Sequence, residues 1–375
     1  MNTNYDAIVV GLGGMGSAAA YHLAERGCRI LGLDANMPGH TNGSSHGQTR
    51  MIRAAHPEGD AYFLLARRAY ALWKSLAHAS GEDLLTVTGG LAIGLPDSEH
   101  VRGRVSSARR HAMDYELLDA AQLSARYPLF RIPDGYVAFY DPLAGFLRPR
   151  NCIEAHLKLA ASRGATLTHG EAVLSWKPEG DGVRVTTSRH TYSASRLVVT
   201  TGAWSPEFLA ELGLPWNVER IVNAHFESLR PALSDAGHCP VYQLDVPEGY
   251  FYGFPMLDGE GMKLGVHKGD RFCTPQTIDR NIGEAEVAEL ADVFNRYMPG
   301  AIGAVRQALT CMYTNTPDGL MAIGRHPRYR QVAYAGGDSG KGFKFTSVIG
   351  EILADLTLTG TTHHPIQALS GERFH

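Results

Sequence analysis

The sequence predicts an α/β fold in two parts, a Rossmann-like domain and an α+β domain with a mostly antiparallel sheet. Three features support this prediction: a strand, glycine turn and helix at the N-terminus, further strand and helix patterns around residues 150–204, and antiparallel-strand patterns between 216 and 310. With 375 residues, of which 44% are hydrophobic and 19% charged, the chain is long enough to form two domains.

The N-terminal unit predicts a dinucleotide site. The apolar run at 7–10 ends in a turn that contains Gly11, Gly13, Gly14 and Gly16, and helix-favouring residues follow. Such glycines permit the tight turn, the approach of a pyrophosphate and close helix packing. A second apolar run ends at Asp34, where an acidic residue is expected to meet a ribose hydroxyl. This fingerprint alone leaves the choice between NAD and FAD open.

The remaining elements are predicted from periodicity and turn signals. A polar loop at 38–48, with two histidines, is too long for a tight connection and is typical of a ligand-contacting segment. We expect helices near 65–73, 154–160, 284–297 and 348–360, a hairpin at 173–186, and strands at 197–201, 250–255, 262–267 and 332–335. The cofactor domain therefore returns at the C-terminus and is discontinuous.

Composition excludes several classes of partner. Lys and Arg total 35 against 38 for Asp and Glu, so the net charge of -3 offers no basic surface for nucleic acid or for an acidic membrane. The N-terminus has no secretory signal and no apolar run approaches about 18 residues, so we expect a cytoplasmic protein. The five cysteines are scattered without a Cys-x-x-Cys pair, which predicts neither a disulfide framework nor a metal site but leaves one special cysteine possible.

Five sequence blocks in a fixed order resemble the family of monomeric sarcosine oxidases and N-methyl-L-tryptophan oxidases, FAD amine oxidases related to D-amino acid and glycine oxidases. The blocks are 11–16, 40–50, 263–265, 311–318 and 339–345, and the resemblance covers essentially the whole chain. It implies a monomer with an FAD-binding domain of the glutathione reductase type at 1–80, 146–215 and 314–375. The substrate domain is then expected at 81–145 and 216–313.

The resemblance implies that FAD is attached covalently through a thioether between Cys311 and the 8α carbon of the flavin. Without the surrounding motif, a lone cysteine is usually an inert core residue. The cofactor contacts implied are Gly11, Gly13, Gly14, Met15, Gly16, Asp34, Ser44, Thr49, Arg50, Val173, Gly202, Trp204, Cys311, Gly340, Gly342, Phe343 and Lys344.

The resemblance also assigns the residues that act on the substrate. Arg53 and Lys344 match the residues that bind a substrate carboxylate, a task suited to a guanidinium fork and an ammonium. Arg50 is expected beside the flavin ring, and Lys263 at the place where oxygen is reduced, since a fixed cation in a dry site stabilises developing negative charge. Active-site positions are further implied for His267, Tyr313 and Tyr252. Isolated cations of this kind would otherwise be read as solvated surface residues.

Two positions depart from the family pattern. Lys341 lies between Gly340 and Gly342, where histidine is common, and Ser45 stands where sarcosine oxidases often have histidine. The backbone carbonyl of Lys341 is still expected to accept a hydrogen bond from the substrate amine. We hypothesise that its added ammonium shifts substrate choice towards a second acidic group.

The activity implied is oxidation of the secondary amine of an N-methyl amino acid to an imine, which hydrolyses to an amine and an aldehyde while O2 becomes hydrogen peroxide. Alternative substrates are a cyclic or larger secondary amino acid such as pipecolate, proline, N-methyltryptophan or a glycated amino acid. A different alternative is an FAD dehydrogenase with another electron acceptor, whose reduced flavin would react slowly with air. A flavin-bearing protein without turnover would be expected to lack the cationic set, which this sequence retains.

Overall fold

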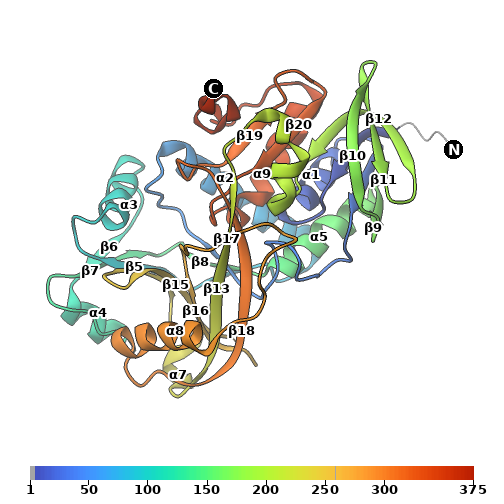
Figure 1. The fold of residues 1–375 in the computed structure, drawn as a ribbon. Helices are drawn as coiled ribbons and strands as arrows, with labels where there is room; N and C mark the ends of the chain where they lie inside the picture. Colours follow the sequence, from blue (N-terminus) through green and yellow to red (C-terminus); the bar gives the residue numbers. More distant parts are fainter. Residues whose placement is uncertain (1–4, 258) are drawn as a thin grey trace.

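Two large β-sheets and a small third sheet organise the chain in the computed structural model, which describes residues 5–257 and 259–375 (Figure 1). Helices cover the first sheet, and antiparallel strands dominate the second. The predicted α/β fold class, with its mixture of parallel and antiparallel strands, is confirmed.

The first sheet is a Rossmann-like sheet with eight strands, ordered β10-β11-β12-β1-β2-β9, and with β20 joining β12 and β19 joining β20. The pairs β1–β2, β1–β12, β2–β9 and β12–β20 are parallel. Its strands are β1 (Tyr5–Val10), β2 (Ile30–Asp34), β9 (Thr166–His169), β10 (Val173–Glu179), β11 (Gly182–Thr187), β12 (Thr191–Val199), β19 (Ala322–Arg325) and β20 (Val332–Gly336).

Helices α1 (Gly14–Glu25), α5 (Pro149–Ser162) and α9 (Thr346–Leu358) pack together against this sheet. The N-terminal and C-terminal parts of the chain therefore lie side by side, as Figure 1 shows. Close packing depends on glycine: a Cβ on Gly350 of α9 would lie 2.5 Å from the backbone of Ala18 in α1. The first sheet therefore combines strands from the N-terminal, middle and C-terminal parts of the chain, as expected for a discontinuous domain.

Gly16 illustrates how the glycine turn fixes the start of α1. A Cβ at this position would lie 1.7 Å from the carbonyl oxygen of Gly11, whereas a Cβ on Gly13 would meet nothing closer than 3.6 Å. Gly16→Ala is therefore expected to lower the free energy of unfolding by about 3 kcal/mol, because backbone must move to relieve the overlap. Thermal unfolding measures the effect. Gly13→Ala is the matched control, and equal unfolding temperatures for the two variants would contradict the packing role of Gly16.

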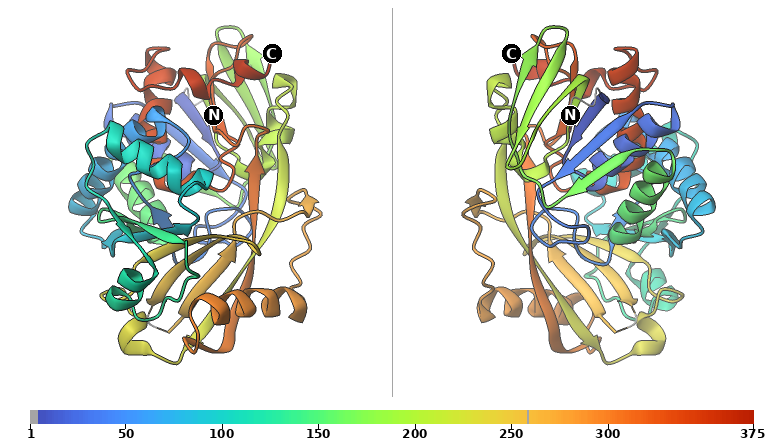
Figure 2. Two further views of the ribbon diagram at one scale, coloured as in Figure 1. Left: turned by 90° about the vertical axis from the view of Figure 1, so that its left-hand side faces the viewer. Right: turned by 90° about the vertical axis from the view of Figure 1, so that its right-hand side faces the viewer.

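The second sheet has nine strands in the order β17-β13-β16-β15-β14-β5-β7-β6, with β18 on β13. Strands β13 and β18 pair antiparallel over most of their length and run from this sheet towards the first (Figure 2). The strands are β5 (Gly90–Gly94), β6 (Glu116–Leu118), β7 (Val137–Asp141), β13 (Asn217–Ser228), β14 (Val241–Val246), β15 (Gly249–Leu257), β16 (Gly261–Val266), β17 (Phe272–Cys273) and β18 (Ile302–Asn315).

A small sheet ordered β3-β8-β4 completes the strands, with β3 at Arg50–Ile52, β4 at Leu85–Val87 and β8 at Gly145–Leu147. Among the described residues, the other helices longer than one turn are α2 (Asp60–Ser80), α3 (Glu99–Arg110), α4 (Ala120–Arg126) and α8 (Glu284–Tyr297), and two short helices are α6 (Ser205–Phe208) and α7 (Pro231–Ser234). The third sheet places Arg50 at its edge, opposite Leu147.

The two large sheets can be compared with the predicted division into domains, which the small third sheet crosses. The strands of the first sheet fall within 1–80, 146–215 and 314–375, and those of the second within 81–145 and 216–313 except for the last residues of β18. The division itself stays a prediction about folding units. The predicted helix at 284–297 is confirmed as α8, and the predicted antiparallel strands at 250–267 as β15 and β16.

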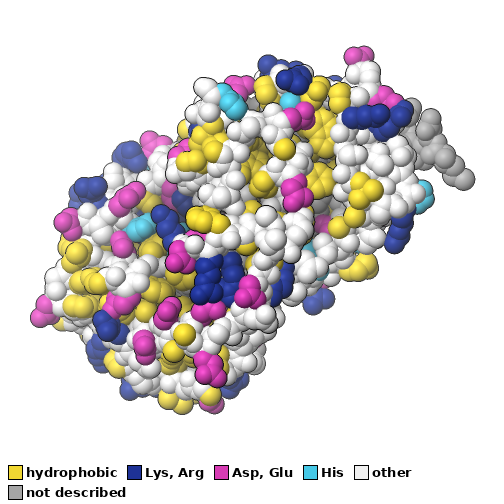
Figure 3. All heavy atoms as spheres, in the orientation of Figure 1, with side chains coloured by type: hydrophobic (Ala, Val, Ile, Leu, Met, Phe, Trp, Pro, Cys, Tyr) yellow, Lys and Arg dark blue, Asp and Glu magenta, His cyan; other side chains and the backbone are white. Residues whose placement is uncertain are grey.

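On the face drawn in Figure 3, Lys and Arg side chains are interspersed with Asp and Glu side chains, so neither sign of charge dominates that face. Within the part of the chain that the structure describes, no helix is long and apolar enough to cross a lipid bilayer.

Candidate active site

A cavity of about 1270 Å³ opens at the carboxyl ends of the parallel strands. Its lining includes the last residues of β1, β2, β9 and β20 and the segment that follows β12. In open α/β sheets, ligands bind at this edge. The topology alone therefore places a ligand site here.

The glycine turn and Asp34 shape one end of this large cavity. Gly11 has a φ of +86°, which favours glycine, and its N–H donates to the carbonyl of Leu33 at 2.9 Å. The carboxylate of Asp34 accepts hydrogen bonds from the backbone N–H groups of Leu12 and Asn36, both at 2.8 Å. These bonds fix the acidic side chain beside the turn while it still lines the cavity.

The large cavity has the volume and the donors to hold FAD. At the start of α1, where the helix dipole and backbone N–H groups favour a pyrophosphate, Gly13 has no side chain, and a Cβ there would already contact Ser45 Oγ at 3.6 Å. Of the predicted cofactor contacts, those that line this cavity are Gly11, Gly13, Gly14, Met15, Asp34, Ser44, Arg50, Val173, Gly202, Trp204, Gly340, Gly342 and Phe343. Gly16 and Thr49 line neither this cavity nor the smaller one described next, because Gly16 packs on Gly11 and Thr49 is buried.

A smaller cavity of about 70 Å³ adjoins the first. The two cavities meet at residues that line both of them: His46, Gly47, Arg50, Leu309, Tyr313, Gly340 and Phe343. The predicted catalytic and substrate-binding residues all line the smaller cavity: Arg50, Arg53, Tyr252, Lys263, His267, Tyr313, Lys341 and Lys344. The fold thus brings together residues from β3, β15, β16, β18 and the loop before α9.

Cys311 also lines the smaller cavity, from β18, where it pairs with Ile221 of β13. Its side chain is largely buried, and its Sγ lies 3.7 Å from the carbonyl oxygen of Ser44 in the polar loop. All five cysteines are free thiols, but the other four line neither cavity. Burial raises the pKa of Cys152 and of Cys239, which marks those two as inert core residues.

Two cations, Arg50 and Lys263, line the smaller cavity without an ion pair to any carboxylate of the described residues. The guanidinium of Arg50 donates to three backbone carbonyls, those of Ser44, His46 and Thr49. The ammonium of Lys263, on β16, makes no hydrogen bond and no ion pair to any described residue. Burial, aided by the charge of Arg50, lowers the pKa of Lys263 to about 7.

Three further cations gather around a single carboxylate at the other side of the smaller cavity. The carboxylate of Glu58 lies 3.1 Å from Lys341 Nζ and 3.8 Å from Arg53 Nη2. Although burial alone would raise the pKa of Glu58, the hydrogen bond with His56 and the charge of Arg53 hold it well below its usual value. Burial lowers the pKa of both Arg53 and Lys344; the charge of Arg104 adds to the effect on Arg53, and the charge of Arg53 adds to the effect on Lys344.

The loop before α9 holds its two lysines in fixed positions. Lys344 Nζ donates to the carbonyl of Lys341 at 2.7 Å, and the indole N–H of Trp73 donates to the carbonyl of Lys344 at 2.9 Å. The Lys341 carbonyl, expected to accept from a substrate amine, therefore already accepts one bond from Lys344. The ammonium of Lys341 lines the cavity but is paired with Glu58.

Neutral aromatic groups form the remaining wall. Burial and the nearby lysines lower the pKa of His267 to about 3, so its imidazole is neutral. Its ring packs edge to face on Tyr313 and Tyr252. Two glycines are required here, because a Cβ on Gly265 would lie 2.5 Å from the Tyr252 ring and one on Gly340 would lie 2.3 Å from the Tyr313 ring.

Several residues at the smaller cavity were missed at the level of sequence. Asn223 and Gln243 line it from β13 and β14, and Glu58 contacts its lysine and arginine from the loop before α2. No local pattern marks these residues, because each reaches the cavity through long-range strand pairing or loop packing. Gln243, for example, lies opposite Tyr252 in the β14–β15 pair.

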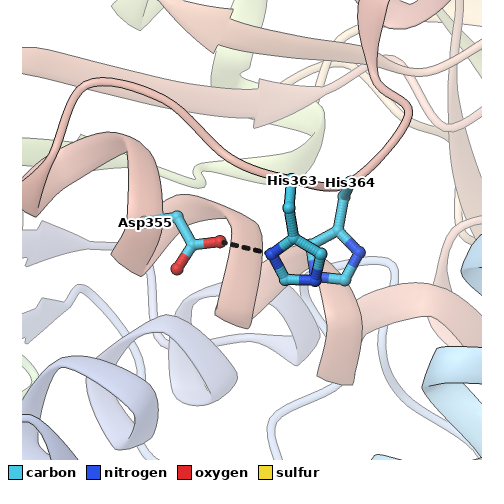
Figure 4. Close-up of side chains that lie close together, drawn as sticks. All are labelled: Asp355, His363 and His364. Atoms are coloured by element: carbon cyan, nitrogen blue, oxygen red, sulfur yellow. Dashed lines mark ion pairs between the residues drawn. The ribbon is translucent and has the colours of Figure 1, made fainter.

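One group of possible metal ligands occurs in the described part of the chain, at Asp355, His363 and His364 near the end of α9 (Figure 4). Two of these three residues already bind other side chains of the protein. The Asp355 carboxylate binds Arg26 at 2.8 Å and accepts from the Thr362 hydroxyl, and His364 Nε2 contacts Glu351 at 2.9 Å. These contacts account for the group as a hydrogen-bonded helix end.

A dinucleotide fold joined to a dry, cationic cavity defines an oxidoreductase whose cofactor supplies the redox chemistry. The family model described as FAD dependent oxidoreductase matches residues 6–356, and the chain belongs to this family. FAD dependence and the predicted family resemblance are thereby confirmed.

Two named relatives match almost the whole length of the chain. The chain is 44% identical to a monomeric sarcosine oxidase of Streptomyces avermitilis over 98% of this chain and 97% of the relative. It is 32% identical to an N-methyl-L-tryptophan oxidase of Yersinia pestis, with 99% and 100% covered. Among solved structures it is similar to NikD, an unusual amino acid oxidase essential for nikkomycin biosynthesis, with a TM-score of 0.87, 26% identity, and 98% and 97% covered.

Proposed function

We propose that the protein oxidises the secondary amine of a sarcosine-like N-methyl amino acid, with O2 as the electron acceptor and hydrogen peroxide as a product. The observation that carries the proposal is the smaller cavity beside the cofactor cavity. It gathers the cationic side chains of Arg53, Lys341, Lys344 and Lys263, of which Arg53 and Lys341 pair with the Glu58 carboxylate. The names of the sarcosine oxidase and N-methyl-L-tryptophan oxidase relatives support the same substrate class.

The large cavity would hold FAD through the glycine turn, Asp34 and the loop before α9, and Cys311 would carry the covalent link. When bound, FAD supplies the two-electron oxidation of an amine C–H bond and returns the electrons to oxygen. The place of Cys311 in the smaller cavity, which it lines together with Arg50 and Lys263, supports this attachment.

Arg53 and Lys344 would bind the substrate carboxylate. Both are buried, and Glu58 neutralises only part of the positive charge around them. A carboxylate between a guanidinium and an ammonium is held in one orientation, which places the amine and its methyl group towards Cys311 and Lys263. The same positive field lowers the pKa of a bound amine, so the neutral, reactive amine is favoured.

Lys263 would assist the reduction of oxygen. Its ammonium has no partner among the described residues and lies in a buried site, where a charge interacts more strongly than in water. Negative charge that develops on oxygen is therefore stabilised without reorganisation of solvent. His267, Tyr252 and Tyr313 exclude water and shape the wall of the cavity.

Lys344→Met is expected to raise the KM for sarcosine about 30-fold or more, because one partner of a buried, charge-assisted pair is removed. Oxidation of N-methylethylamine, which has no carboxylate, should lose little. Steady-state kinetics with both amines measure the difference. Lys74→Met, on the exposed face of α2, is the matched control. A similar loss for both amines in Lys344→Met would contradict carboxylate binding.

A two-stage assay tests the proposed function. The purified protein is mixed anaerobically with sarcosine, N-methyl-L-tryptophan, pipecolate, proline and a glycated amino acid, and flavin absorbance is followed before air is admitted. Reduction by sarcosine followed by rapid reoxidation in air is the expected result. Rapid reduction with slow reoxidation would indicate a dehydrogenase, and preference for pipecolate or proline would indicate a cyclic-amine oxidase.

Two further proposals concern the state of the protein. We propose that it acts as a monomer, as the names of its sarcosine oxidase relatives suggest, and light scattering tests this. A cytoplasmic location stays a prediction, for which cell fractionation is the measurement.

A further inference from the structure

Arg104, on α3, is a buried arginine without a carboxylate partner. Its side chain is 2% exposed, and none of the ion pairs between described residues includes it. Its Nη1 donates to the carbonyl of His100 at 3.0 Å, its Nη2 donates to Gln243 Oε1 and to the Tyr250 hydroxyl at 3.1 Å, and its Nε has no acceptor.

A comparison within the same molecule shows how unusual this is. Arg220 is also buried, with 4% exposure, but its guanidinium pairs with the Glu286 carboxylate at 2.6 Å and donates to two backbone carbonyls. A buried charge without a counter-charge destabilises a fold by several kcal/mol. The fold thus compensates Arg220 and leaves Arg104 uncompensated, which favours a role in binding over a role in stability.

Gln243 connects Arg104 to the smaller cavity. It lines that cavity together with Arg53, Lys341 and Lys344, whereas Arg104 lines neither cavity. Arg104 occupies Oε1 of the Gln243 amide, so the two N–H donors of Nε2 are the polar atoms left for a ligand. No described residue accepts a hydrogen bond from them.

Tyr250 and His100 hold this arrangement from behind. The Tyr250 ring stacks on His100 with centroids 3.9 Å apart, and its other contact is edge to face with His267, which lines the cavity. Because Arg104 donates both to Gln243 and to the Tyr250 hydroxyl, it connects the Gln243 amide to the ring that contacts His267. The guanidinium therefore fixes which end of Gln243 is presented to a bound molecule.

The charges around the smaller cavity leave room for a second anion. Glu58 forms ion pairs with Arg53 and Lys341, Lys344 has no ion pair to a described residue, and Arg104 adds a further positive charge behind Gln243. One substrate carboxylate bound by Arg53 and Lys344 compensates part of this excess. Asp141 and Asp338 make no ion pair with a described cation, and their carboxylates instead accept hydrogen bonds from the backbone N–H groups of Ala54, Leu143 and Gly340.

We propose that Gln243, positioned and polarised by Arg104, forms a second carboxylate subsite, so that the preferred substrate is an N-methyl amino acid with an acidic side chain, such as N-methylaspartate. The inference rests on the proposed function and specifies its substrate class. Gln243 contacts the side-chain carboxylate, and Arg104 acts through it as a positioning residue.

The kinetic test compares racemic N-methylaspartate with racemic N-methylasparagine, which differ only in the side-chain charge, and uses sarcosine as the reference for each variant. The wild type is expected to prefer the aspartate compound in kcat/KM. Gln243→Met and Arg104→Met should each lower this preference about 10-fold, chiefly through KM, since hydrogen bonds to charged groups are involved. Arg104→Lys should restore part of it, and Arg102→Met, at an exposed position of α3, should not change it.

A binding measurement gives a second readout that needs no turnover. Calorimetry of succinate and of succinamate, in which a carboxamide replaces one carboxylate, is expected to show tighter binding of succinate to the wild type. The preference should be lost in Gln243→Met. This variant tests the subsite even if Arg104→Met fails to fold. Equal affinities in the wild type, or a preference unaffected by Gln243→Met, would overturn the proposal. Absence of oxidation of every N-methyl compound, with the succinate preference intact, would instead reject the proposed function alone.

Discussion

Replacing Cys311 with serine is expected to abolish covalent attachment of the flavin. The wild-type protein, denatured and precipitated with acid, should retain its yellow colour, whereas Cys311→Ser should release all of it into the supernatant. The physical reason is the position of the thiol: Cys311 lines the smaller cavity, which adjoins the cofactor cavity, whereas the other four cysteines line neither cavity. Absorbance of pellet and supernatant, or flavin fluorescence on a denaturing gel, measures the result.

Cys28→Ser is the matched control for this experiment. Cys28 is half-buried in the turn after α1 and lines neither cavity, so its replacement should leave the flavin attached. Free flavin from denatured wild-type protein would show that attachment does not occur. Colour retained by the Cys311→Ser pellet would place the link on another residue.

Lys263→Met is expected to slow the reaction with oxygen by about 100-fold or more, the effect typical of losing one preorganised electrostatic group in a buried site. Anaerobic reduction by sarcosine should change by only a few fold, because the substrate carboxylate is bound by other cations. Burial lowers the pKa of Lys263 to about 7, so the oxygen reaction of the wild type should slow as the pH rises above that value. The variant should lose this dependence.

Stopped-flow measurements separate the two half-reactions. Lys177→Met, at an exposed position of β10, is the matched control, and Lys263→Arg retains the charge. Slowing of both half-reactions to the same extent in Lys263→Met would remove Lys263 from the assigned role and leave it as a residue that shapes the cavity.

Elements that are marked by residue spacing and turn residues within one segment were predicted correctly from the sequence. The glycine turn at 11–16, α8 and the β10–β11 hairpin all follow from spacing and turn residues, and the structure has them at the expected places. The segment at 81–145 gave no clear pattern. Its strands β5 and β7 are stabilised by pairing with each other and by β14, which lies about 150 residues further along the chain.

The residues of the site divide in the same way, into those marked by a motif and those brought together only by the fold. Motifs located Lys263, Arg53 and Lys344, and the structure brings these residues to one cavity. Glu58, which neutralises part of their charge, and Gln243 and Arg104, which form the proposed second subsite, belong to no motif. Their roles depend on α3, β14 and the loop before α2 meeting in space, and such contacts cannot be derived from the spacing of residues within one segment.

The stoichiometry of a single oxidation tests the central claim most directly: that a cationic cavity beside a tethered flavin oxidises an N-methyl amino acid with oxygen. Purified protein is given a limiting amount of sarcosine in air, and oxygen uptake, hydrogen peroxide, formaldehyde and glycine are quantified together. The account predicts equal amounts of all four. Oxygen uptake without formaldehyde, or flavin reduction without peroxide on exposure to air, would contradict it.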